Sequence, residues 1–480
     1  MVMKISALTL SSCSGKKFPP DFKFGAATAA YQVEGAWNVS DKAASIWDTF
    51  THNNPTMIAD GSSGDVACDS YNLWETDIQL AKDMGLHFYR FSISWPRLLP
   101  NGFANKISED GTRYYNNLID GLLANGIEPL VTLYHWDLPQ NLQDLGGMTN
   151  PLLAEWFGAY SRVAFTLFGD RVKTWATFNE PVSICGLTYE TGYIAPGIYS
   201  PGIGSYICAK NLMMAHATSY RIYDKEFRAK YNGKVGIVNN HVWYAPYSSE
   251  YEDLTYLARQ LGFIYSHPIY SKTGGWPPSV EGIIAKNSEE EGYPTSRLPK
   301  FTAEEIEFVK GTADYYGMNL YTSRLVREAN NSTFFLWPTN GDLDLNLDLL
   351  ADPSWEVGLD WLVIHPPGIR AQLNLIREEF GDVEIIVTEN GFSTSSDELD
   401  DVTRIQYLRD YLEQVLLAIT EDGVNVTGYT AWSLLDNFEW NSGYTSKFGL
   451  VRVNFTDPFR SRTPRASAEY YADVIRHHSL

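Results

Sequence analysis

Cysteine, positive charge and long apolar runs are all scarce in this 480-residue chain, and each shortage excludes a class of protein. The four cysteines are too few and too scattered for a disulfide-stabilised scaffold, and no C-x-x-C pair indicates a zinc or redox site. One disulfide can form, but the sequence does not name its pair. The cysteines are Cys13, Cys68, Cys185 and Cys208.

The charge balance is strongly acidic, with 37 Lys and Arg against 58 Asp and Glu and a formal net charge of −21. Such a surface repels nucleic-acid phosphates and anionic lipid, so we expect neither nucleic acid nor a membrane as a partner. No run of about 20 apolar residues occurs, so no segment is expected to span a membrane. The nine histidines show no H-x-H or H-E-x-x-H spacing, and the sequence therefore predicts no metal site.

The first 17 residues resemble a fragment of a signal peptide, although their apolar centre is short and is broken by Ser and Thr. The chain also carries Asn-x-Ser/Thr glycosylation sites, which favour a secreted or lumenal protein, with a cytoplasmic one as the alternative. The sequence does not determine the oligomeric state. The glycosylation sites are Asn38, Asn330, Asn331, Asn425 and Asn454.

Short apolar runs alternate with amphipathic helical patterns along the rest of the chain, with no linker or change of composition between them. The pattern predicts one α/β domain, a single (β/α)8 TIM barrel with long strand-to-helix loops. A doubly wound sheet is the alternative, but it requires a glycine-rich phosphate turn, and G-A-A-T-A-A-Y-Q follows the first strand here. The predicted strands are 22–32, 88–95, 128–136, 174–180, 234–243, 314–322, 383–390 and 426–433.

The sequence predicts two helices together with the residues that end them. Residues 151–168 have apolar side chains at spacings of three and four, with Asn150 as the expected cap and Gly169 at the end. Residues 402–422 repeat the pattern before Gly423.

If the chain forms a barrel, its functional residues belong at the C-terminal ends of the strands. Nearly every predicted strand finishes with a side chain that can form hydrogen bonds or stack on a ring. These side chains are Gln32, Arg90, His135, Asn179, Glu180, Asn239, Asn240, Asn319, Tyr321, Glu389, Asn390 and Trp432.

Two of these strand ends carry acids, Glu180 and Glu389, and a closed barrel can bring both to one mouth. Paired carboxylates are the equipment for glycoside hydrolysis, in which one acid is protonated and the other ionised. Arg90 and Tyr321 would hold Glu389 ionised, while the apolar approach to Glu180 favours its neutral form. Pro181 is expected to leave Glu180 extended. Regular alternation would then place Asn179 and Glu180 on opposite faces, so both serve one site only if the strand end is irregular.

Six motifs in this order resemble glycoside hydrolase family 1, the β-glucosidase family. Within it the chain looks like the animal digestive-type branch, because of S-R-L-P-K-F-T-A-E-E-I and E-D-G-V-N-V-T-G-Y-T-A-W-S. The resemblance covers residues 18–480, which we treat as one catalytic barrel after an N-terminal extension at 1–17. The motifs are F-G-A-A-T-A-A-Y-Q-V-E-G-A-W, Y-R-F-S-I-S-W-P-R, T-L-Y-H-W-D-L-P-Q, T-F-N-E-P, V-T-E-N-G-F and A-W-S-L-L-D-N-F-E-W.

The resemblance implies hydrolysis of small β-D-glucosides with retained anomeric configuration and without a cofactor. It makes Glu180 the acid/base and Glu389 the nucleophile, with Arg90 and Tyr321 steadying the nucleophile. It also implies a cis peptide bond after Trp432. The residues it implies for binding the sugar are Gln32, His135, Asn179, Tyr321, Trp432, Glu439 and Trp440.

The residues around Glu439 support this assignment independently of the family. A carboxylate between two aromatic side chains, in D-N-F-E-W, is costly to bury unless it binds something, and sugar hydroxyls would satisfy it.

The chain departs from the family pattern at several positions outside the two acids. Met148 and Pro367 replace common tryptophans and would reshape the wall of the site, so the aglycone cannot be inherited from relatives. Gly275 stands where aspartate is usual, and the common Gly-Lys-Gly is missing from A-W-N-V-S-D-K-A-A-S. Arg324 and Arg327 are expected to be solvated loop charges.

Two alternative functions stay open at this point. If Arg324 and Arg327 instead received an anionic aglycone, the chain would be a thioglucosidase acting on a sulfated thioglucoside. The non-enzyme alternative is an inactive sugar-binding relative, which usually lacks one of the two carboxylates.

Overall fold

The computed structural model describes residues 16–329, 344–359 and 361–480. Cys13, most of the predicted N-terminal extension and the glycosylation sites at Asn330 and Asn331 therefore lie outside the described residues.

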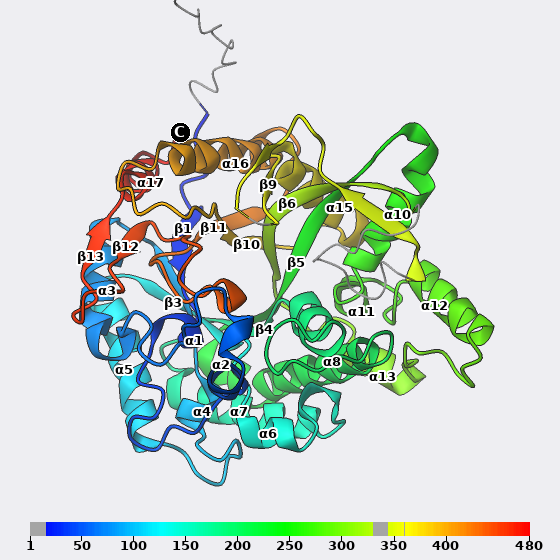
Figure 1. Ribbon diagram of the computed structural model, residues 1–480, viewed down its shortest axis with the longest axis horizontal. Coiled ribbons are helices and arrows are strands. Elements are labelled where there is room, and N and C mark those ends of the chain that lie inside the picture. Colours follow the sequence, from blue (N-terminus) through cyan, green and yellow to red (C-terminus); the bar gives the residue numbers. More distant parts are fainter. Residues whose placement is uncertain (1–15, 330–343, 360) are drawn as a thin grey trace, which may run out of the picture.

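All eight predicted strands are present and form one closed ring. Each strand is parallel to its neighbours, and β11 pairs with β1 to close the barrel, with Ala27 opposite Trp432. Helices surround the strands (Figure 1). The barrel strands are β1 (Lys23–Ala27), β2 (Phe88–Ser92), β3 (Glu128–Tyr134), β4 (Thr174–Asn179), β5 (Lys234–Pro246), β6 (Tyr316–Glu328), β10 (Ile385–Asn390) and β11 (Val426–Trp432).

A principal helix follows each strand, and further helices and turns occupy the loops. The principal helices are α3 (Ser70–Asp83), α5 (Glu109–Ala124), α7 (Leu153–Phe168), α8 (Gly204–Ile222), α10 (Glu252–Gly262), α15 (Pro367–Phe380), α16 (Val402–Thr420) and α17 (Ala466–His477). The helices and turns in the loops include α1 (Ala30–Val33), α2 (Ile46–Asn53), α4 (Trp95–Leu98), α6 (Gln140–Asp144), α9 (Arg228–Tyr231), α11 (His267–Tyr270), α12 (Pro278–Glu290), α13 (Ala303–Val309) and the π-helical turn η3 (Ser183–Leu187).

Three small pairs of strands lie outside the ring. Strand β7 (Leu347–Leu350) adds antiparallel to β6 where that strand continues above the barrel. The other two pairs are β8 (Glu356–Val357) with β9 (Val363–Ile364), and β12 (Val451–Val453) with β13 (Arg462–Pro464).

The barrel interior is filled by side chains from consecutive strands. Phe88, Leu130, Ala176 and Val238 come one each from β2 to β5 and form a buried cluster of their own. The ring of Phe88 fits because β1 has Gly25 beside it, where a Cβ atom would lie 2.4 Å from the ring. The interior is therefore a packed core.

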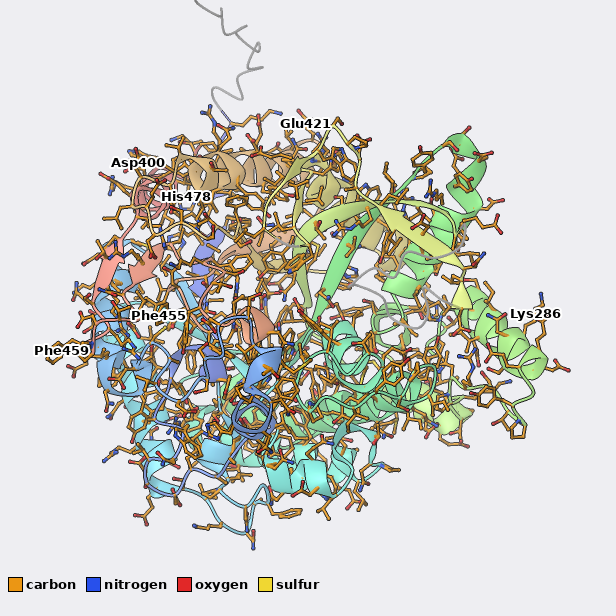
Figure 2. The ribbon with its side chains drawn as sticks, in the orientation of Figure 1. Lys286, Asp400, Glu421, Phe455, Phe459 and His478 are labelled. Atoms are coloured by element: carbon orange, nitrogen blue, oxygen red, sulfur yellow. A yellow bond between two sulfur atoms is a disulfide. The ribbon has the colours of Figure 1, made fainter. Side chains whose placement is uncertain are left out.

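Several charged side chains mark the outer surface of the molecule. Lys286, Asp400 and Glu421 are exposed at its periphery, and Phe459, 83 % exposed, projects from one edge (Figure 2). Among the described residues, no helix combines the length and the apolar character that crossing a bilayer requires.

The element boundaries correct several expectations. Helix α7 begins at Leu153, two residues later than predicted, because Asn150 accepts a hydrogen bond from the backbone of Leu152 in the preceding turn. The first strand ends at Ala27, so Gln32 lies on helix α1 and not at a strand end. Arg90 lies inside β2.

Candidate active site

A cavity of about 570 Å³ opens at the C-terminal ends of the barrel strands, and we call it the central cavity. Its size lies within the usual range for small-molecule sites. Eight of the predicted site residues line it: His135, Asn179, Glu180, Tyr321, Glu389, Trp432, Glu439 and Trp440. The other two, Gln32 and Arg90, lie directly behind this wall, where each contacts a residue that lines it.

The end of β4 is irregular, and this irregularity brings Asn179 and Glu180 to the same cavity. The pairing of β4 with β5 shifts register between Ala176 and Asn179. Glu180 has a positive φ of 55°, so it is not extended as expected from the proline that follows. Left-handed backbone is costly for a residue with a Cβ atom, and it persists where the surrounding structure enforces it.

Asn319 on β6 contacts both of these side chains. Its Nδ2 donates to Glu180 Oε1 at 2.8 Å and to Asn179 Oδ1 at 3.1 Å. Burial raises the pKa of Glu389, and the Asn319 side chain is among the groups that oppose this rise, so Asn319 lies beside both acids. A retaining mechanism requires the two carboxyl groups to lie about 5 Å apart, and we predict that spacing for Glu180 and Glu389.

Glu389 is held by two donors. Arg90 Nη1 contacts Glu389 Oε1 at 2.5 Å, and the Tyr321 hydroxyl donates to Oε2 at 2.7 Å. Burial raises the pKa of Glu389 above its ordinary value, and the Arg90 charge and the Tyr321 hydrogen bond oppose that rise. Arg90 is itself fully buried, and its Nη2 donates to Asn179 Oδ1 at 2.7 Å.

Glu180 has only neutral donors in direct contact. Asn319 bonds one carboxylate oxygen and the Ser183 hydroxyl bonds the other. Burial first, and then the charge of Glu389, raise the pKa of Glu180 to about 7. The two acids therefore differ in surroundings: Glu389 touches a cation and Glu180 does not, so Glu389 is the one that ionises more readily.

A third acid, Glu439, shares the cavity. Burial and the charge of Glu389 raise the pKa of Glu439 to about 8. Gln32 Nε2 lies 3.4 Å from Glu439 Oε2, and Gln32 Oε1 is a buried acceptor without a partner among the described residues. Such an orphaned acceptor beside a cavity is free to bind a ligand hydroxyl.

Aromatic side chains form one wall of the cavity. The ring of His135 stacks on Trp432 and on Trp440, at centroid distances of 5.7 and 5.9 Å. Asn179 Nδ2 contacts His135 Nε2 at 3.0 Å, and burial holds the pKa of His135 well below its usual range, so the ring is neutral. The peptide bond between Trp432 and Ser433 is cis, as the family resemblance implies.

The expectation that Arg324 and Arg327 are solvated loop charges was wrong, because both lie within β6. Arg324 is buried and donates to Thr322 Oγ1 and to the carbonyl oxygens of Ser323 and Trp361. Arg327 pairs with Asp348 at 2.7 Å. Among the described residues that line the central cavity, none is Lys or Arg.

Met148 and Pro367, which stand where the family commonly has tryptophan, do not line the cavity. Met148 is buried, and its backbone N–H donates to the Tyr189 hydroxyl. Pro367 is the first residue of α15. Neither is among the lining residues, so the effect expected of them on the cavity wall is not direct.

Several residues of the site were missed by sequence reasoning. Ser183 is buried in the turn after β4, and its only signal is a hydroxyl residue three positions after an acid. The others lie in loops whose path the pattern does not reveal: Tyr193, Ile194, Trp361, Asn441 and Phe448.

Comparison with known proteins places these features in a family. A family model described as Glycosyl hydrolase family 1 matches residues 14–480. The chain is 44 % identical over 466 residues to Myrosinase 1 of Brevicoryne brassicae, covering 96 % of this chain and 98 % of that protein. It is 43 % identical to the cytosolic beta-glucosidase of Homo sapiens, covering 96 % and 99 %.

Solved structures agree with the sequence matches. An aphid myrosinase superimposes with a TM-score of 0.93 at 43 % identity, covering 97 % of this chain and all of the other. The rice Os3BGlu6 beta-glucosidase superimposes with a TM-score of 0.88 at 37 % identity, covering 95 % and 99 %.

Proposed function

The chain belongs to glycosyl hydrolase family 1, and from that premise we propose that it hydrolyses small β-D-glucosides with retention, using Glu180 as acid/base and Glu389 as nucleophile. The observation that carries the assignment is the unequal environment of two buried acids in one cavity: Arg90 contacts Glu389, whereas only neutral groups contact Glu180.

In the first half of the reaction, a carboxylate oxygen of Glu389 attacks the anomeric carbon of the sugar. The glycosidic bond breaks as Glu180 gives its proton to the departing oxygen, and a covalent glycosyl–enzyme forms. In the second half, Glu180, now ionised, removes a proton from water. The resulting oxygen attacks the anomeric carbon, the bond to Glu389 breaks, and Glu180 is protonated again.

The remaining residues bind the sugar. Gln32, His135, Asn179, Glu439 and Trp440 would form hydrogen bonds with its hydroxyls, and Trp432 would lie beneath its ring. The unpartnered Gln32 Oε1 and the neutral His135 ring support this arrangement, because each can form a hydrogen bond with a sugar hydroxyl without burying a charge.

The test is turnover of 4-nitrophenyl β-D-glucoside by the purified protein, with the product configuration followed by proton NMR. We expect β-glucose as the first product and loss of turnover in Glu389→Gln. Sugar binding without turnover of any glucoside by the wild-type protein would instead make the chain an inactive relative.

Thioglucosidase activity is the second candidate, favoured by the 44 % identity to Myrosinase 1. The cavity argues against an anionic aglycone, because its described lining has three carboxylates and no Lys or Arg. We therefore expect a neutral aryl O-glucoside to be hydrolysed faster than a sulfated thioglucoside. The opposite order of kcat/KM would favour the second candidate.

A secreted or lumenal location is part of the proposal. The structure contains a disulfide between Cys185 and Cys208, a bond that persists mainly in oxidising compartments. The glycosylation sites Asn38 and Asn425 are exposed. A loss of apparent mass on treatment of the native protein with an N-glycosidase tests this; an unglycosylated protein with free Cys185 in its source tissue would indicate the cytoplasm.

A further inference from the structure

The turn that follows β4 places a hydroxyl group against Glu180. Ser183 is the first residue of η3, three positions after Glu180, and is fully buried. Its Oγ donates to Glu180 Oε2 at 2.8 Å. The backbone fixes this approach, because the N–H of Ile184 donates to the carbonyl oxygen of Glu180 at 3.0 Å. Ser183 therefore bonds the carboxylate oxygen that Asn319 leaves open.

Asn240 on β5 supplies a second link. Its Nδ2 donates to Ser183 Oγ at 3.3 Å. Because one acceptor site of the hydroxyl is then occupied, the single proton of Ser183 is directed toward Glu180. Asn240 lines the central cavity, and its Oδ1 is buried without a partner among the described residues. Among the described residues, the hydrogen bond of the Asn240 side chain is therefore the one to Ser183.

We propose that Asn240 and Ser183 form a hydrogen-bond relay that positions the carboxylate of Glu180 and favours its ionised form. The relay rests on the proposed role of Glu180 as acid/base. Both residues act through Glu180, so they are positioning residues and need no contact with the substrate.

The relay matters because Glu180 has to exist in two charge states in each catalytic cycle. A hydroxyl that donates to the carboxylate stabilises the ionised form, which is the base of the second half-reaction. Burial and the charges of Glu389 and Glu439 favour the protonated form, and Arg90 opposes them from β2. Three other titratable groups that face the cavity are neutral: Tyr321, and the rings of His135 and His241. Ser183 and Asn319 are thus the groups that limit the rise directly by hydrogen bonding.

The experiment compares the pH dependence of kcat/KM in wild type, Ser183→Ala and Ser183→Thr with an aryl β-glucoside. Ser183→Ala removes the donor, so the alkaline midpoint should move up by on the order of one pH unit. Ser183→Thr keeps the hydroxyl and should return the midpoint to the wild-type value. KM at pH 5, where Glu180 is protonated in all three proteins, should not change.

A second measurement does not depend on turnover. Protein labelled with carbon-13 at the glutamate side-chain carboxyl is titrated by NMR, and the Glu180 signal is assigned by its loss in Glu180→Gln. The Glu180 midpoint should rise in Ser183→Ala and rise less in Asn240→Ala, which only frees the hydroxyl to turn. If Ser183→Ala fails to fold, Asn240→Ala carries the same test.

The NMR titration tests the relay, and turnover of a β-glucoside tests the proposed function, so the two can fail separately. If the NMR midpoint rises in Ser183→Ala while the wild type hydrolyses no β-glucoside, the relay stands and the proposed function is wrong. If the wild type is active but the midpoint is unchanged in Ser183→Ala and Asn240→Ala, or moves equally in Ser183→Thr, the relay is overturned.

Discussion

Arg90 and Glu389 form an ion pair inside the barrel mouth, at 2.5 Å and with the arginine side chain fully enclosed. Removing two charges from water costs free energy, so a buried ion pair contributes little net stability. We infer that this pair is retained for the function of its members. In the proposed mechanism, this cation favours the ionised form of the buried Glu389 carboxylate, which would attack the sugar. The same guanidinium bonds Asn179, so one arginine links the proposed nucleophile to the strand that carries the proposed acid.

Replacing Arg90 by Gln should therefore disable the nucleophile and destabilise the fold together. Without the cation the pKa of Glu389 rises further, so less of it is ionised and the acidic limb of kcat/KM moves to higher pH by at least about one unit. We expect kcat/KM at pH 6 to fall by about 10²-fold or more, and the free energy of unfolding to fall by roughly 3–5 kcal/mol. Urea unfolding and pH–rate profiles measure both effects.

Arg162→Gln is the control, because Arg162 also pairs with a glutamate, Glu226, but does so on the surface. It should leave the pH profile of kcat/KM unchanged, and it should change the free energy of unfolding by no more than about 1 kcal/mol. An unchanged acidic limb in Arg90→Gln would mean that Arg90 does not set the charge of Glu389.

The stability of the protein should fall as the pH rises from about 5 to about 9. The pKa of Glu439 is about 8 and that of Glu180 about 7 in the folded protein, both above the ordinary value for Glu. A group with a raised pKa contributes stability that is complete below the unfolded-state pKa and is lost as the pH rises through the folded-state pKa. The loss should therefore develop between about pH 5 and pH 9.

Glu439→Gln removes one of these groups and should narrow the difference in Tm between pH 5 and pH 9 by a few degrees. The exposed Glu226→Gln is the control: Arg162 lowers the pKa of Glu226, so its ionisation is complete below this window. Equal pH slopes of Tm in wild type and Glu439→Gln would show that Glu439 ionises normally in the fold.

The sequence predicted the barrel because its evidence is local. Apolar runs long enough for a strand mark all eight strands of the ring, and apolar spacing in α16 marks a helix that ends two residues before the predicted end. The C-terminal ends of β5 and β6 could not be predicted from the local sequence. Both strands continue past the barrel, where β5 pairs with β6 and β6 pairs with β7. Pairing of that kind depends on partners distant in sequence.

The site shows the same limit at single residues. The motifs predicted that Glu180 and Glu389 face one cavity, which they do, but they did not predict the backbone conformation of Glu180. The bias of a following proline toward extended backbone was overruled by the surrounding structure, as the register shift in β4 shows. Arg324 was taken for a surface charge because nothing in its neighbours along the chain reveals the carbonyl oxygens that surround it.

The disulfide between Cys185 and Cys208 should stabilise the segment that carries the proposed acid. It joins η3, which begins three residues after Glu180, to α8 and closes a loop over a sequence separation of 23. Cys208→Ala should lower the free energy of unfolding by about 2–4 kcal/mol. The buried, unpaired Cys68 gives the control, since Cys68→Ala removes a thiol without opening a loop. Equal urea midpoints for wild type and Cys208→Ala would exclude this role.

The stereochemistry of chemical rescue should identify which acid does what. Glu389→Gly leaves room for a small anion on the face from which the nucleophile attacks, so azide with an activated aryl β-glucoside should give α-glucosyl azide. Glu180→Gly keeps the nucleophile, so the glycosyl–enzyme forms and azide then attacks from the opposite face, giving β-glucosyl azide. Each variant alone should lose at least about 10³-fold in kcat with a poor leaving group. Proton NMR of the products distinguishes the two anomers. Exchange of the two products between the variants would reverse the roles proposed for Glu180 and Glu389, and β-azide from both would show that neither residue is the nucleophile.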